Sequence, residues 1–129
     1  MADILSADGN IVDGEMKLVE AGQIRLGKPV WQAQEAYMHN SPAFHVEDIN
    51  APLLLLHGDF DTGVTGIIGA ERMYNLMLRA GKKPALVRYW GEGHVAQSAS
   101  AMRDQWQRVT AWFGHYLEPS SSRSSTTRD

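Results

Sequence analysis

The chain holds 129 residues, a usual length for a single domain. Its 43% hydrophobic and 21% charged residues are ordinary for a globular protein, and cysteine is absent, which excludes disulfides and a cysteine nucleophile. Fifteen acidic against twelve basic residues argue against a nucleic-acid-binding surface. No apolar run approaches the ~20 residues of a membrane helix. Because no signal-peptide pattern is visible, we expect a cytoplasmic protein.

The first part of the chain predicts irregular structure with two short helices. Residues 1–14 show no sustained hydrophobic period, and their Asp-Gly pairs are turn signals. One helix is expected over residues 15–24 and another over residues 31–38, with a Gly-Lys-Pro break between them. Pro42 ends the second helix, because the residue before a proline disfavours helical backbone.

The pattern becomes regular from residue 53 onward. The apolar run 53–56 does not alternate with polar residues, which is typical of a strand buried on both faces in a parallel sheet. Helical spacing follows over residues 66–80 and ends at Gly81, a residue type favoured after a helix. A second strand is expected over residues 85–90 and a last helix over residues 100–117. This alternation predicts an α/β fold with parallel strands and flanking helices.

Two loops at the carboxyl ends of the expected strands carry the residues that could do chemistry. Catalytic groups in open α/β sheets sit in such loops. Asp61 follows the first strand and His94 the second, so the carboxylate could orient the imidazole as in the acid and base of a serine hydrolase triad. The alternatives are that Asp61 caps the next helix and that His94 is an exposed loop residue.

The neighbouring polar residues of these loops have structural interpretations. Asp59 is expected to accept loop backbone N–H groups. Glu92 is expected to be a solvated loop acid, and His57 a packing or hydrogen-bonding residue.

The aromatic residues near the C-terminal helix are expected to pack. Trp106, Trp112 and Phe113 are expected at core or near-core positions. The apolar residues of this helix that recur at helical spacing form one stripe, which is Met102, Trp106, Val109, Phe113 and Tyr116 or Leu117. Trp90 at a strand end either lines a pocket or packs against the protein.

The pair Asp59 and Asp61 does not complete a metal-binding motif. A phosphatase of the haloacid-dehalogenase type would need Thr four residues after the first Asp, where Gly63 stands. A calcium loop would need a ligand at the same position and Glu at position 70, which is Ala. We therefore predict no metal and no cofactor.

Several sequence segments together resemble one enzyme family. The segments LLLLHGDFDTGV, RAGKKPALVRYWGEGH and WQRVTAWFGHYL resemble the C-terminal end of the catalytic domain of prolyl oligopeptidase family serine peptidases. The upstream segments EAGQIRLG and YMHNSP resemble the same family, so the likeness covers roughly residues 20–117. It implies an α/β-hydrolase fold, with Asp61 as the triad acid and His94 as the triad base.

The nucleophile that this family requires has no counterpart in the sequence. Family members place it in a G-x-S-x-G turn, and no serine here has that context; Ser6 stands in LSADG and Ser41 in NSP. We therefore interpret residues 1–117 as the C-terminal half of a peptidase-type α/β-hydrolase domain, a partial α/β-hydrolase fold. Residues 118–129, rich in Ser and Thr, are predicted to be a disordered tail.

Two functions remain open at this point. The chain is part of a serine hydrolase of peptide or acyl bonds that works only when the missing half completes it. Alternatively, it is a non-catalytic, self-associating α/β module. In either case an exposed sheet edge and exposed helix faces predict a homodimer or higher oligomer, without nucleic acid or membrane partners.

Overall fold

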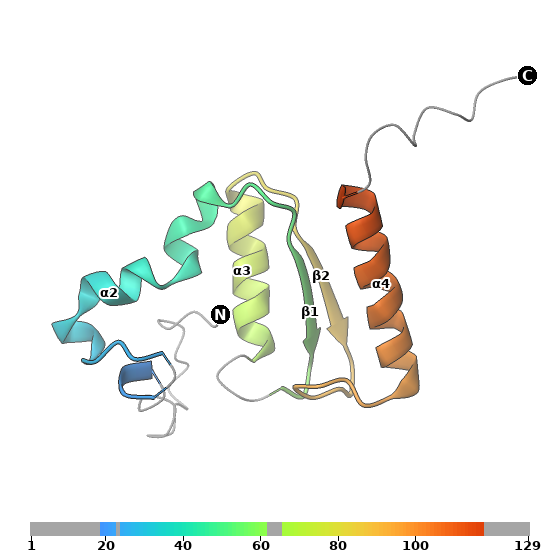
Figure 1. Cartoon of the computed structure of the whole chain (residues 1–129), viewed down its shortest axis with the longest axis horizontal. Coiled ribbons are helices and arrows are strands. Elements are labelled where there is room, and N and C mark those ends of the chain that lie inside the picture. Colours follow the sequence, from blue (N-terminus) through green and yellow to red (C-terminus); the bar gives the residue numbers. More distant parts are fainter. Residues whose placement is uncertain (1–18, 23, 62–65, 118–129) are drawn as a thin grey trace, which may run out of the picture.

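The protein has a small parallel sheet with one long helix on each side. The computed structural model describes residues 19–22, 24–61 and 66–117. Strand β1 (Leu54–Gly58) pairs with β2 (Ala85–Tyr89), and helix α3 (Ile67–Arg79) connects them. Helix α4 (Ala99–Leu117) follows β2, and the two strands stand between α3 and α4 (Figure 1). The mixed α/β fold predicted from the sequence is confirmed.

The two strands run parallel with a register that aligns their carboxyl ends. Leu54 is opposite Ala85, and Gly58 is opposite Tyr89. The loops that follow β1 and β2 therefore leave the sheet at the same edge, as expected for adjacent parallel strands.

Helix α3 ends at the residue that the sequence indicates. Gly81 has φ 73°, a left-handed conformation that glycine adopts without steric cost. The N–H of Gly81 donates to the carbonyl of Leu78 (3.0 Å), and that of Lys82 donates to the carbonyl of Met77 (2.9 Å). These two bonds satisfy the last helical carbonyls in the Schellman pattern. Lys82 also donates through Nζ to the carbonyl of Glu47 (2.8 Å), which connects this turn to the N-terminal segment.

The N-terminal segment is built from short turns. The helix expected over residues 31–38 is divided into a 3₁₀ turn (Val30–Gln32) and helix α2 (Gln34–His39). A further 3₁₀ segment (Pro42–Asp48), which the sequence did not indicate, leads toward β1. Tyr37 anchors α2, because its ring is buried and its hydroxyl donates to the carbonyl of Lys28 (3.1 Å). Residues 15–18 and 23 of the helix expected over residues 15–24 lie outside the described residues, as does the tail at residues 118–129.

Helix α4 packs on the sheet through a face other than its apolar stripe. Trp106 is 73% exposed and Phe113 55% exposed, so the prediction that they are core residues is wrong. Helical spacing shows which apolar residues share one face of the helix, but it does not show whether another element packs against that face. The face of α4 turned toward the sheet is an adjacent one, marked by buried Ala101 and by Asp104, which accepts a hydrogen bond from Tyr89 (2.8 Å). Trp112 is half-buried.

Trp90 is 76% exposed and its ring contacts the side chain of Arg88, two residues before it. The guanidinium carbon of Arg88 lies 4.4 Å from the Trp90 ring centroid, a cation–π arrangement. Among the helices of the described residues, none has the length and apolar character to cross a membrane.

Candidate active site

The loops after β1 and β2 are held together by backbone hydrogen bonds. The N–H of Asp59 donates to the carbonyl of Tyr89 (3.1 Å), and the N–H of Phe60 donates to the carbonyl of Glu92 (2.9 Å). The first of these continues the parallel ladder by one residue. The second carries the contact into the loops, so the two segments that bear the predicted site residues form one unit.

Glycine at position 58 allows this close approach. A β-carbon there would overlap the carbonyl oxygens of Gly93 and Glu92, and it would lie 2.8 Å from the carbonyl carbon of Glu92. These are backbone atoms, which cannot move aside as the end of a long side chain can. Gly58 is therefore required for the loop carrying His94 to cross the end of β1.

The carboxylate of Asp59 fixes the turn that follows β2. The N–H of Gly91, which has φ 80°, donates to Oδ1 of Asp59 (2.6 Å). The prediction that Asp59 accepts a loop backbone N–H is confirmed.

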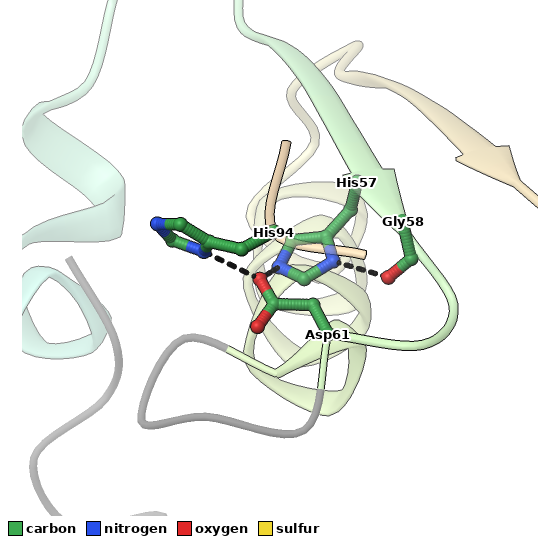
Figure 2. A network of polar contacts seen from close by, with 4 residues as sticks. All are labelled: His57, Gly58, Asp61 and His94. Carbon is green, nitrogen blue, oxygen red and sulfur yellow. Dashed lines mark hydrogen bonds and ion pairs between the residues drawn. The ribbon is translucent and has the colours of Figure 1, made fainter. Parts of the chain in front are cut away.

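Asp61 and His94, the two residues predicted as acid and base, lie in contact. Nδ1 of His94 is 2.9 Å from Oδ2 of Asp61 (Figure 2). The Asp61 side chain is 7% exposed, whereas the His94 side chain is 73% exposed. A carboxylate can only accept, so Nδ1 carries the proton and Nε2 lies on the opposite edge of the ring. In the neutral imidazole Nε2 is then the basic nitrogen, which is the tautomer a general base needs.

A second histidine, His57, also contacts the Asp61 carboxylate. Its Nδ1 donates to the carbonyl of Gly58 (2.9 Å), and its Nε2 lies 3.6 Å from Oδ2 of Asp61 (Figure 2). The hydrogen bond confirms the packing or hydrogen-bonding task expected for His57 from the sequence, but its contact with Asp61 adds it to the predicted site. The signal that could have found it is its place at the end of β1, four residues before Asp61.

Glu92 is buried, so the expectation of a solvated loop acid is wrong. Its side chain accepts hydrogen bonds from the backbone N–H groups of Gln97 (2.6 Å) and Ser98 (3.3 Å). Hydrogen bonding from Ser98 and Gln97 holds the pKa of Glu92 below its ordinary value of 4.5. The polar composition of its glycine-flanked loop suggested exposure, but the chain turns back over Glu92 before α4 begins. The carboxylate therefore fixes the segment that contains His94.

Within residues 19–22, 24–61 and 66–117, no group of three or more His, Asp or Glu side chains is arranged to hold a metal ion.

The chain is similar to several hydrolases of known sequence. “Probable glutamyl endopeptidase, chloroplastic” from Arabidopsis thaliana is 28% identical over 104 residues, which are 79% of this chain and 11% of that protein. “Putative carboxymethylenebutenolidase” from Salmonella typhimurium is 32% identical over 87 residues, which are 60% of this chain and 32% of that protein. The chain thus spans about a third or less of the length of these relatives.

Two solved structures share the arrangement of strands and helices. A puromycin-hydrolyzing peptidase from Mycobacterium tuberculosis superposes with a TM-score of 0.65 and 26% identity, over 72% of this chain and 14% of that one. A protein described as “Putative Dienelactone Hydrolase” from Klebsiella pneumoniae superposes with a TM-score of 0.53 and 27% identity, over 60% of this chain and 35% of that one. A sequence profile of the prolyl oligopeptidase family matches residues 12–120. The α/β fold, these neighbours and the length of the profile match together show that the chain belongs to the prolyl oligopeptidase family.

Proposed function

We propose that the chain supplies the acid and the base of a serine hydrolase that cleaves peptide or related acyl bonds. One observation carries this proposal, the 2.9 Å contact between Nδ1 of His94 and Oδ2 of Asp61. A buried carboxylate that accepts from an exposed imidazole leaves Nε2 on the outer edge of the ring, toward which a substrate could approach. The hydrolase relatives support the same reaction class.

The proposed step is proton transfer through His94. Its Nε2 takes the proton of an attacking serine hydroxyl, while Asp61 stabilises the imidazolium that forms. The imidazolium then donates that proton to the leaving group, which departs from the acyl carbon as the tetrahedral intermediate collapses. Water repeats the cycle on the acyl-enzyme and restores both residues.

In this proposal the nucleophile comes from outside these 129 residues. No serine of the chain stands in a G-x-S-x-G context. Ser41 is fully buried, so its hydroxyl is not open to a substrate. The low share of each relative that the chain covers supports completion by a further segment that carries the serine and the oxyanion hole.

The test is reconstitution with a separately produced, serine-bearing part of a related hydrolase. Ester hydrolysis is expected when the two parts are mixed, and His94→Ala or Asp61→Asn is expected to lower its rate by about 10⁴-fold or more. His39→Ala is the matched control, since His39 lies on α2 and outside the site. The proposal fails if the parent chain restores no hydrolysis, or if His94→Ala hydrolyses as fast as the parent.

A fluorophosphonate probe examines the nucleophile separately. We expect no labelled serine in the chain alone and a labelled serine on the complementing part. Labelling of any serine of this chain would show that the nucleophile is already present.

A further inference from the structure

We propose that His57 is a positioning residue that holds the Asp61 carboxylate in place for His94. This inference rests on the proposed function, because it assigns His57 a task in the acid–base pair of that reaction. The observations that carry it are the two contacts of the His57 ring, one to the end of β1 and one to Asp61.

The His57 ring is fixed to the strand by one of its nitrogens. Nδ1 lies 2.9 Å from the carbonyl oxygen of Gly58, and a carbonyl only accepts, so Nδ1 is the donor. The same carbonyl lies 3.4 Å from the backbone nitrogen of Asp61. A single backbone oxygen, next to the last ladder contact of the sheet, therefore restrains both the imidazole and the start of the acid-bearing turn.

The opposite edge of the ring faces the carboxylate. Nε2 of His57 lies 3.6 Å from Oδ2 of Asp61, the same oxygen that contacts Nδ1 of His94 (Figure 2). Because Nδ1 already donates to Gly58, this contact attracts the carboxylate when Nε2 is protonated as well, and it is then an ion pair. The side chains of His57 and Asp61 are 14% and 7% exposed, so this contact is largely withdrawn from water. A partly buried ring that is anchored on one side and paired with the carboxylate on the other limits the rotation of Asp61 about its side-chain bonds.

The orientation of the Asp61 carboxylate affects the direction of the His94 ring more strongly than it would if both residues were buried. His94 is 73% exposed and sits in a loop, so the direction of its ring depends strongly on where Oδ2 lies. The contacts run in series from the Gly58 carbonyl to His57, from His57 to Asp61, and from Asp61 to His94. His57 acts through Asp61, and it is not assigned contact with a substrate.

Two substitutions separate the two contacts of the ring. In His57→Asn the amide nitrogen can replace Nδ1 and donate to Gly58, but the side chain is too short to reach Asp61. In His57→Gln the amide nitrogen can replace Nε2 and donate to the Asp61 carboxylate. If His57 positions Asp61, the Gln variant retains the His94–Asp61 hydrogen bond and the Asn variant loses it.

The measurement is the histidine side-chain ¹H–¹⁵N correlation spectrum of the full chain, which reports the Nδ1–H of His94 directly. The parent and His57→Gln are expected to show a hydrogen-bonded Nδ1–H tautomer at His94, and His57→Asn is expected to lose that signal. The indole N–H signals of the four tryptophans report whether each variant is folded. His39→Gln, on α2, is the control and should leave the His94 signal unchanged.

The outcomes separate this inference from the proposed function. An unchanged His94 signal in folded His57→Asn would overturn the inference, and so would its loss in both variants, since a purely structural role would not distinguish Gln from Asn. Absence of the signal in the parent would instead contradict the Asp61–His94 pair itself. If the spectra are as expected but His94→Ala supports reconstituted hydrolysis at the parent rate, the proposed function is wrong and the positioning of Asp61 by His57 stands.

Discussion

Gly58 is the residue whose substitution most directly disturbs the contact between the loops that follow β1 and β2. The backbone of residues 92 and 93 occupies the space that a β-carbon at position 58 would need. Gly58→Ala must therefore push the His94 loop away from the end of β1. We expect a loss of about 1–3 kcal/mol in the free energy of unfolding, and loss of the His94 Nδ1–H signal. Chemical denaturation and the histidine spectrum measure the two effects.

Gly69 provides the matched control for that substitution. It lies in α3, and a β-carbon added there meets no atom within 4 Å. Alanine is a better helix former than glycine by up to about 1 kcal/mol, so Gly69→Ala should leave the site intact and stabilise the chain. Equal effects of the two substitutions would mean that the crowding at Gly58 does not limit the approach of the loops.

At the scale of residues, the sequence predicts contacts that depend on topology and misses those that depend on loop conformation. Asp61 and His94 could be paired because each follows one of two adjacent parallel strands. The task of Glu92 could not be predicted, because its partners are backbone N–H groups that the chain brings over it before α4. The direction of such a group is set by the φ and ψ angles of the loop, which side-chain chemistry does not specify.

Among the elements, the start of α4 depends on the ionisation of Glu92. Hydrogen bonding to Ser98 and Gln97 lowers its pKa from 4.5, so folding favours the ionised form. The stabilisation is complete above pH 4.5 and is lost as the pH falls below that value through the lower pKa of the folded state. We expect the thermal midpoint to fall with pH in this range, and to fall less steeply in Glu92→Gln.

The control for Glu92 is an exposed acid of similar size. Glu35, in the first turn of α2, is exposed, and Glu35→Gln should leave the steepness of the acid transition as in the parent. If Glu92→Gln keeps the full pH dependence, the carboxylate does not fix the turn before α4.

A hydrogen bond between Tyr89 and Asp104 connects β2 to α4. The Tyr89 hydroxyl donates to Oδ2 of Asp104 (2.8 Å), and burial together with this bond raises the pKa of Tyr89 to about 12. Its stabilisation is therefore complete below pH 10 and is lost as the pH rises toward 12. Tyr89→Phe should lower the free energy of unfolding at neutral pH.

A double-mutant cycle decides whether that loss belongs to the contact. Tyr89→Phe should cost less in an Asp104→Asn background than in the parent, measured by chemical denaturation. Equal costs in the two backgrounds would show that α4 is held by its other contacts, such as those of buried Ala101.

The elements themselves differ in how far the sequence determines them. The bounds of α3 and of both strands lie within about two residues of those expected, because Gly81 and the apolar runs act locally. The 3₁₀ segment Pro42–Asp48 is too short to show a hydrophobic period, and it forms where Pro42 restricts the chain. The face of α4 that packs on the sheet could not be predicted, because the sequence shows which face of the helix is apolar but not which elements lie next to it.

At the scale of the whole molecule, two surfaces are candidates for contact with another protein chain. The bonds from Ala85 to Leu53 and from Asp59 to Tyr89 show that the backbone groups of Leu53 and Asp59, which flank β1, point toward β2. By the alternation of a parallel ladder, the backbone groups of Leu54 and Leu56 then point to the other edge, where the described two-stranded sheet has no further strand. The stripe of α4 adds exposed apolar side chains, which are Met102, Trp106, Phe113 and Leu117.

For the chain on its own, we expect a second copy to cover these surfaces and sedimentation to show a dimer at micromolar concentration. Trp106→Lys should raise the dissociation constant about 10-fold or more, because a large exposed aromatic is a typical anchor of an interface. Gln107→Lys adds the same charge beside the stripe, at an exposed position, and should leave the dimer intact. A monodisperse parent monomer would show that neither surface associates, and equal weakening by both variants would attribute the effect to charge.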